Sequence, residues 1–413
     1  MGQQISLKDR EILREVAKKQ FEMSQTPEMK SLGKEWILHN DCKSDRVMVV
    51  IEWQTFWQEV ILPLLNCESE IARMLEGQLY GGFVGKMLFE DDSIVRDHFP
   101  IRQQNNFRPF DIEVGVTYSE DGGGIGHHFK ETIHDLEADF HLLCPSTYGS
   151  SIQHVVEKKE MAEEIFGDIL PVRITGCSLD VGMTRDLVHI MGMETMLYSI
   201  CDYPELFHRM MQMLTDDYLA YFHFLEQQGL LLSTTSSEQV WQGSYAFTED
   251  LPASHPGGMR LNEVWGYMDS QESSGMSPEM YGEFIFPYYR KIGREFGLLS
   301  YGCCEAVDPI WERNISSLHN LRRVSISPWC DEGYMGDRLR GKRIIYHRKP
   351  SPNFLGVNKN LEDEEVRRYF KKTMVAAREC TLEITQRDVY TVHHDMEKVK
   401  KYVEIIRQCA RYR

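Results

Sequence analysis

Residues 263–305, EVWGYMDSQESSGMSPEMYGEFIFPYYRKIGREFGLLSYGCCE, decide the fold class. The segment opens with an apolar run typical of a buried strand, 263–271. Ser277 and Pro278 then provide an N-cap and a first-turn proline for a helix over 277–297. A second apolar run, 298–305, follows directly. A strand–helix–strand unit of this length predicts two neighbouring parallel strands joined by a helix.

The same alternation continues along most of the chain. Further strands are expected in the runs 46–53 (RVMVVIEW), 170–178, 322–329, 343–352 and 381–388, with helical patterns between most of them. This number of units predicts a single TIM (β/α)8 barrel. The first hundred residues are mainly helical in pattern. We therefore expect an N-terminal helical extension over 1–105 that includes the first barrel strand, and the remainder of the barrel over 106–413.

Composition excludes several classes of partner. The formal net charge is −17, which argues against a nucleic-acid ligand, because phosphate binding needs a Lys/Arg surface. No apolar run approaches the ~18 residues of a membrane-spanning helix, and no signal peptide precedes the first helix, so a cytoplasmic location is expected. Ten cysteines without paired spacing read as reduced thiols. A homodimer is one possible assembly. The glycine cluster at 121–126 lacks Walker spacing and predicts a loop.

Two segments carry a family resemblance. Residues 263–292, with the pattern SPEMYGEFIFPYYRKI, and residues 174–211, ending in CDYPELFHRMM, resemble the uroporphyrinogen decarboxylase superfamily. The resemblance implies a TIM barrel with an N-terminal helical extension. It also implies one of two activities, which are decarboxylation of uroporphyrinogen and zinc-assisted methyl transfer involving a corrinoid protein. The decarboxylases carry an arginine-rich segment near residues 46–60. Here that segment is acidic and aromatic, which would repel a polycarboxylate substrate.

The resemblance places the zinc motif of the methyltransferases on strand 298–305. Its His-x-Cys falls on Tyr301 and Cys303, so the histidine is missing. Strand alternation puts Tyr301, Cys303 and Glu305 on one face and Cys304 on the other, packed outward. Zinc accepts cysteine sulfur and carboxylate oxygen, so Cys303 and Glu305 are expected as ligands. Candidates for a third ligand are Cys330, His347 and Glu238.

Other polar residues are expected around the same barrel mouth. Asp269 and Gln271 lie in the acidic loop of the superfamily, Lys349 shares a strand face with His347, and Glu52 ends the first strand. We expect Tyr301, Asp269 and Glu52 to be catalytic. Gln271, Lys349 and Glu238 are expected to bind substrate, and Cys303, Glu305, Cys330 and His347 to hold the metal.

The sequence thus favours a corrinoid-dependent methyltransferase. Zinc is its expected cofactor, and a separate corrinoid protein and a small, possibly methoxylated aromatic, substrate are its expected partners. Two alternatives stay open. One is a metal-free barrel that binds a small molecule or a tetrapyrrole without turnover. The other is a decarboxylase with a diverged grip on its substrate.

Overall fold

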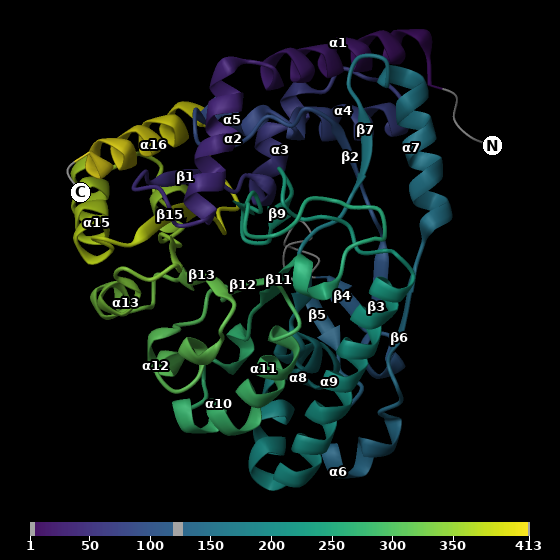
Figure 1. Cartoon of the computed structure of the whole chain (residues 1–413), viewed down its shortest axis with the longest axis vertical. Coiled ribbons are helices and arrows are strands. Elements are labelled where there is room, and N and C mark those ends of the chain that lie inside the picture. The colour runs from purple at the N-terminus through teal and green to yellow at the C-terminus, as the bar shows by residue number, and fades with distance from the viewer. Residues whose placement is uncertain (1–4, 119–126, 412–413) are drawn as a thin grey trace.

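Seven parallel strands form the central sheet of the computed structural model, which describes residues 5–118 and 127–411 (Figure 1). The glycine cluster at 121–126 lies outside the described residues. Nearly every residue of these strands is buried, as expected for parallel strands that are covered on both faces. In spatial order the strands are β1 (Met48–Ile51), β15 (Thr381–Gln386), β14 (Ile345–Arg348), β13 (Leu321–Ile326), β12 (Leu298–Tyr301), β11 (Trp265–Met268) and β8 (Leu179–Val181).

Helices connect these strands and pack around the outside of the sheet (Figure 1). Ser277 caps α10 by accepting a hydrogen bond from the Met280 amide, as the sequence predicts. The helix expected over 277–297 is divided at Ile285, because Pro287 starts a new first turn. The helices are α8 (Met183–Asp202), α9 (Pro204–Gln227), α10 (Pro278–Phe284), α11 (Phe286–Gly293), α12 (Asp308–Trp311), α13 (Glu332–Leu339), α14 (Asn353–Gly356), α15 (Asp363–Ala376) and α16 (Met396–Ala410).

The N-terminal part is mainly helical. Its apolar side chains, among them Leu13 and Trp36, form a second core that includes Met48 and Val50 on one face of β1. Val49 and Ile51, on the other face of β1, belong to the main core. The first strand is therefore the element that ties the two cores together. The helices are α1 (Leu7–Ser24), α2 (Pro27–Asn40), α3 (Trp57–Val60), α4 (Glu70–Gly81), α5 (Val84–Phe89) and, later in the chain, α7 (Ile152–Phe166).

The strand expected over 170–178 contains one observed strand, and the next strand, β8, begins just beyond that range at Leu179. β7 (Val172–Thr175) pairs in parallel with β2 (Phe99–Arg102), whereas the following strand, β8, pairs with β11 in the central sheet. Within residues 5–118 and 127–411 no strand pairing joins β8 to β1, so these two strands are the edges of the sheet. The structure thus confirms the α/β class, with a parallel central sheet surrounded by helices.

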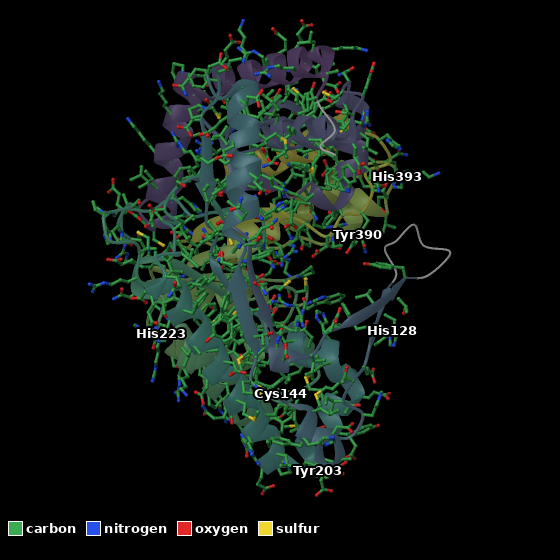
Figure 2. All side chains as sticks on the ribbon, turned by 90° about the vertical axis from the view of Figure 1, so that its right-hand side faces the viewer. His128, Cys144, Tyr203, His223, Tyr390 and His393 are labelled. Atoms are coloured by element: carbon green, nitrogen blue, oxygen red, sulfur yellow. The ribbon has the colours of Figure 1, made fainter. Side chains whose placement is uncertain are left out.

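Three short antiparallel pairs complete the fold. They are β3 (Asn105–Arg108) with β6 (Thr147–Ser150), β4 (Gly115–Tyr118) with β5 (His127–Lys130), and β9 (Gln239–Val240) with β10 (Ser244–Tyr245); a short helix, α6 (Leu136–Asp139), follows β5. Figure 2 shows β5, which carries His128, extending from the body of the chain. None of the helices in the described part of the chain has the length and apolarity to cross a membrane.

Candidate active site

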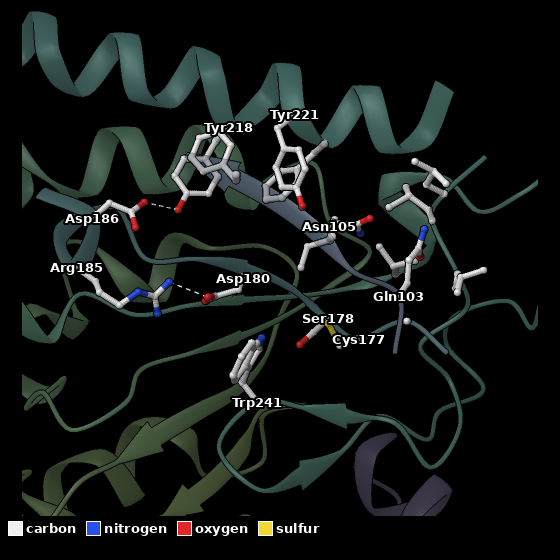
Figure 3. A pocket seen from close by; sticks show the side chains of 18 residues that line it. Gln103, Asn105, Cys177, Ser178, Asp180, Arg185, Asp186, Tyr218, Tyr221 and Trp241 are labelled. Carbon is white, nitrogen blue, oxygen red and sulfur yellow. Dashed lines mark hydrogen bonds and ion pairs between the residues drawn. The ribbon is translucent and has the colours of Figure 1, made fainter. Parts of the chain in front are cut away.

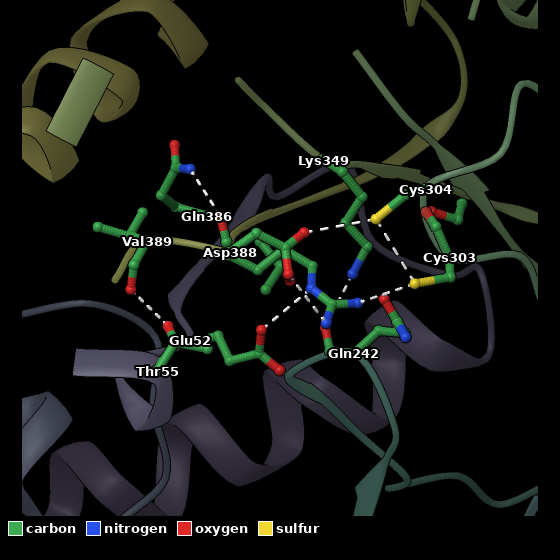
Figure 4. Close-up of polar contacts among 12 residues, drawn as sticks. Glu52, Thr55, Gln242, Cys303, Cys304, Lys349, Gln386, Asp388 and Val389 are labelled. Atoms are coloured by element: carbon green, nitrogen blue, oxygen red, sulfur yellow. Dashed lines mark hydrogen bonds and ion pairs between the residues drawn. The ribbon is translucent and has the colours of Figure 1, made fainter. Parts of the chain in front are cut away.

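Ionisable side chains gather where five central strands end. Glu52 follows β1, Asp269 follows β11, Cys303 follows β12, Lys349 follows β14 and Arg387 follows β15. The carboxyl ends of parallel strands meet at one edge of the sheet, and barrel enzymes place their chemistry there. Arg387 contacts Glu52 and Cys303 directly, and Gln242 links Lys349 to the Tyr267–Asp269 pair, so this edge carries one polar cluster (Figure 4).

The turn after β12 brings both cysteines into this cluster. Gly302 has a φ of +97°, and a Cβ there would lie 3.1 Å from the Ser325 side chain. This left-handed residue ends the alternation of the strand. The Cys303 and Cys304 sulfurs lie 3.6 Å apart, and the Cys304 sulfur also lies 3.4 Å from Asp388 Oδ2. The expectation that Cys304 packs outward is therefore wrong, because the strand ends at Tyr301.

Arg387 connects the cysteines to the first strand. Its Nη1 lies 3.5 Å from the Cys303 sulfur, and its Nε lies 3.0 Å from Glu52 Oε2. Asp388 Oδ1 is 3.4 Å from Nη2 of the same guanidinium. Figure 4 shows Glu52 and Asp388 on one side of this cluster and Cys303 on the other. One cation therefore faces two carboxylates and one thiol.

The two cysteines differ in acidity. A hydrogen bond from the Cys304 thiol, and next the charge of Arg387, lower the pKa of Cys303 to about 7. The same contact raises the pKa of Cys304, and burial and the charge on Cys303 act in the same direction. Cys303 is thus the more acidic thiol of the pair. A thiolate at neutral pH is a nucleophile and a metal ligand.

The Glu305 carboxylate stabilises the turn that carries Cys303 and Cys304. Its Oε2 accepts a hydrogen bond from the Cys303 amide at 2.7 Å, and its Oε1 accepts one from the Ser270 amide at 3.1 Å. Burial, and next the charge on Cys303, raise the pKa of Glu305 to about 7. Both carboxylate oxygens are therefore engaged by the main chain, and they join the turns after β11 and β12.

Asp269 belongs to a buried hydrogen-bonded chain. Tyr267 donates its hydroxyl to Asp269 Oδ2 at 2.8 Å and accepts a hydrogen bond from Gln242 Nε2 at 2.7 Å. Burial, and next the charge on Glu305, raise the pKa of Asp269 to about 7. Its second oxygen, Oδ1, has no hydrogen-bond partner among the described residues. A carboxyl group with this pKa can give or take a proton at neutral pH.

Lys349 lies on the other side of Gln242. Its Nζ donates to the Gln242 carbonyl oxygen at 2.8 Å and contacts His347 Nε2 at 3.0 Å. Burial, and next the charge of Arg387, lower the pKa of Lys349 to about 7. His347 Nε2 also lies 2.8 Å from Thr385 Oγ1, and burial keeps the pKa of His347 well below its usual value. His347 is thus a neutral group in the sheet interior.

Four expected site residues lie elsewhere. The Cys330 sulfur contacts Ser327 Oγ at 3.6 Å and the Glu305 carbonyl oxygen at 3.9 Å, within the core. Glu238 lies 3.4 Å from His98 Nε2. Tyr301 is 1% exposed and shares hydrogen bonds with two buried hydroxyl groups. Gln271 is exposed and starts a 3-10 turn, so it does not share a strand face with Asp269.

The expected zinc ligands do not converge. Among the residues that the structure describes, no three His, Cys, Asp or Glu side chains are grouped as metal ligands would be. The oxygens of Glu305 face main-chain amides, His347 Nε2 faces Thr385 and Lys349, and the Cys330 sulfur faces Ser327. As placed, this donor set does not fit zinc.

A cavity of about 270 Å³ opens beside this cluster, between β8, α9 and the β9–β10 turn (Figure 3). Asp180 lines it and forms an ion pair of 2.7 Å with Arg185. The β9–β10 turn joins the two sites, because Trp241 lines the cavity while Gln242 contacts Tyr267 and Lys349. The cavity is thus connected to the polar cluster through this turn.

Sequence reasoning missed Arg387, Asp388, Asp180 and Arg185. The pair Arg387–Asp388 had a detectable signal, since two opposite charges directly follow the apolar strand 381–386. The ion pair of Asp180 with Arg185 had a weaker signal, because β8 is only three residues long.

Comparisons with known proteins support the fold. No protein-family model matches the chain, and no curated protein sequence matches it. Among solved structures, a methyltransferase from Methanosarcina mazei is similar, with a TM-score of 0.51 over 91% of this chain and 98% of that chain, at 12% identity. At this identity the likeness shows a shared fold, and function has to be argued from the site.

Proposed function

We propose that this chain is a methyltransferase that moves a methyl group between a small substrate and a separate corrinoid protein. The observation that carries the proposal is the position of the polar cluster of Cys303, Asp269 and Arg387 beside a small-molecule cavity, at the edge of the sheet where barrel enzymes act. The likeness to the Methanosarcina mazei methyltransferase supports this choice among barrel chemistries. The finer architecture proposed is a (β/α)8 barrel in which the β2–β7 pair spans the gap between β1 and β8.

Each group has a role in this proposal. The cavity holds the methylated substrate. Asp269, whose pKa burial raises to about 7 and whose Oδ1 has no hydrogen-bond partner among the described residues, is the group that can hold or release a proton. Arg387 keeps Cys303 ionised, and the thiolate orients or accepts the substrate. The proposal contains no zinc-dependent step, because the expected ligands do not converge.

The decisive experiment is a methyl-transfer assay with a reduced corrinoid protein and a panel of methylated amines and methoxylated aromatics. Formation of the methylated corrinoid, detected by its absorption spectrum, would support the proposal. With a methoxylated aromatic as methyl donor, whose leaving oxygen takes up a proton, Asp269→Asn should lower the rate by about 10²-fold or more. Asp216→Asn, an exposed aspartate paired with Lys291 at 2.7 Å, is the matched control. Release of carbon dioxide from uroporphyrinogen without methyl transfer would refute the proposal.

Zinc bound through Cys303 stays a prediction, and metal analysis of the purified chain tests it. About one zinc per chain, lost in Cys303→Ala, would require that the ligands rearrange around the ion. Unchanged metal content in that variant would remove Cys303 from the ligand set.

A further inference from the structure

The cavity beside β8 has an aromatic wall. Phe107 lies against Tyr218 and Tyr221, with ring centroids 4.4 Å and 5.2 Å apart, and all three line the cavity. Trp241 lines it from the β9–β10 turn and is 43% exposed. Figure 3 shows the tyrosines above the cavity and the tryptophan below it. Aromatic faces are negative, so they attract cations.

Polar oxygens without partners face the same space. Ser178 is 1% exposed and lines the cavity, and its hydroxyl has no hydrogen-bond partner among the described residues. Asp180 Oδ1 is also buried without a partner, while Oδ2 is held by Arg185. Buried acceptors without partners are costly, unless a ligand or water meets them. The Ser178 and Asp180 oxygens can therefore each interact with a positively charged group or a hydrogen-bond donor of a ligand.

Several carboxyl groups surround the cavity. Asp180 is balanced by Arg185, but Asp186 also lines the cavity, hydrogen-bonded to the Tyr218 hydroxyl at 2.5 Å. Asp269 adds a further buried carboxyl close enough to act on the charge of Arg185. A cation would relieve this crowding of carboxylates, whereas an anion would add to it.

We propose that this cavity binds a methylated ammonium ion, with its positive nitrogen held between the aromatic wall and the oxygens of Ser178 and Asp180. At about 270 Å³ the cavity is small for a ligand site, which suits such an ion. A neutral methoxylated aromatic would pack on the same rings but leave the Asp180 oxygen without a partner.

Transfer of the methyl group from the bound ion rests on the proposed function, whereas binding of the ion in the cavity does not. In the transfer step the carbon–nitrogen bond breaks and both electrons stay on nitrogen, so the cation leaves as a neutral amine. The new bond to the methyl carbon uses the electron pair of the reduced corrinoid of the partner protein. No proton is needed for a quaternary ammonium donor.

Calorimetric titration of the full chain at constant ionic strength tests the site. Choline chloride is the probe, and 3,3-dimethylbutan-1-ol is its neutral counterpart of the same shape. We expect choline to bind at least about tenfold more tightly than the alcohol. Trimethylammonium chloride, which carries an N–H donor, shows whether the two oxygens require a hydrogen bond as well as charge.

Variants assign the binding to this cavity. Trp241→Ala should weaken choline binding by about tenfold, and Asp180→Asn should weaken it further. Trp329→Ala replaces a tryptophan that is 77% exposed, and Asp216→Asn replaces an exposed, ion-paired aspartate; neither should change the affinity. Thermal unfolding by circular dichroism shows that each variant is folded, and Trp241→Phe should retain most of the affinity if Trp241→Ala unfolds.

Equal binding of choline and the alcohol, or choline binding that survives both Trp241→Ala and Asp180→Asn, would overturn the inference. Methyl transfer from a methoxylated aromatic without any choline binding would overturn it while supporting the proposed function. Choline binding that depends on Trp241 and Asp180, without transfer to any corrinoid protein, would support the site and refute the proposed function.

Discussion

Replacing Arg387 by methionine should raise the pKa of Cys303. The guanidinium Nη1 lies 3.5 Å from the sulfur. At an effective dielectric constant of about 20, two unit charges at this separation interact by about 5 kcal/mol, or about 3.5 pKa units. This is an upper limit, because Glu52 and Asp388 share the same cation. We expect a rise of about one to two units, from about 7 toward the ordinary range of a thiol.

The rate of alkylation by iodoacetamide measures this shift. Only the thiolate reacts, so a pKa of about 7 leaves half of Cys303 reactive at neutral pH, and a pKa of about 9 leaves about 1%. Alkylation is followed from pH 5 to pH 10 by mass spectrometry of the peptide that carries Cys303 and Cys304. Peptide resolution is needed because Cys144, Cys177 and Cys201 are exposed.

Two further variants make the result interpretable. Arg343→Met removes an arginine that pairs with Asp250 at 2.6 Å, away from the cysteines, and should leave the profile unchanged. Cys304→Ala should also raise the pKa of Cys303, because the Cys304 thiol provides the largest stabilisation of the thiolate. An Arg387→Met profile that coincides with that of the unmodified chain would refute the assignment of Arg387 as the counter-ion of Cys303.

Three other substitutions test the buried polar groups. Glu305→Gln should lower the free energy of unfolding, measured by urea titration, by about 1–3 kcal/mol. The reason is that the new side-chain NH2 group must face the main-chain amide of Ser270 or Cys303. An unchanged urea midpoint would contradict this placement of Glu305. Tyr301→Phe should cost about 1 kcal/mol of stability and little activity, since its hydroxyl bonds only Ser270 and Tyr281; a large loss of rate per folded molecule would restore its expected catalytic role. Burial lowers the pKa of Lys349 to about 7 in the folded chain, whereas in the unfolded chain it is about 10.4. Between these two pH values the unfolded chain binds more protons than the folded one. The free energy of unfolding therefore rises with pH, by at most about 1.4 kcal/mol per pH unit. Lys349→Met should lose this rise, and urea titrations at pH 7, 8.5 and 10 would show whether it does.

The sheet could be anticipated from the sequence because parallel strands buried on both faces are continuous apolar runs. The runs at 298–305, 322–329, 343–352 and 381–388 each contain an observed strand. The strand in the run at 170–178 is β7, which pairs with β2, whereas β8, which pairs with β11 in the central sheet, begins only at Leu179. Tertiary contacts decide which of the two joins the central sheet, so the sequence pattern could not.

The site was harder to anticipate, for a local reason. Strand alternation carried Tyr301, Cys303 and Glu305 onto one face, but the strand ends before Gly302, whose positive φ redirects the next residues. The sequence alone does not show whether a glycine at the end of a strand has a positive φ. The companion of Cys303 proved to be Arg387, which lies 84 residues away in the chain. Spacing within one motif cannot reveal such a contact.

The Tyr267 hydroxyl connects the two halves of the site. It lies between Asp269, whose charge acts on both Cys303 and Arg185, and Gln242, which belongs to the turn that also carries Trp241. A positive ligand in the cavity would therefore favour ionisation of Asp269. The negative charge gained by Asp269 would raise the pKa of Cys303 and so partly offset the lowering of that pKa by the ligand. Because these groups share one buried network, their protonation states change together. Binding in the cavity and the acidity of Cys303 are for this reason properties of a single site.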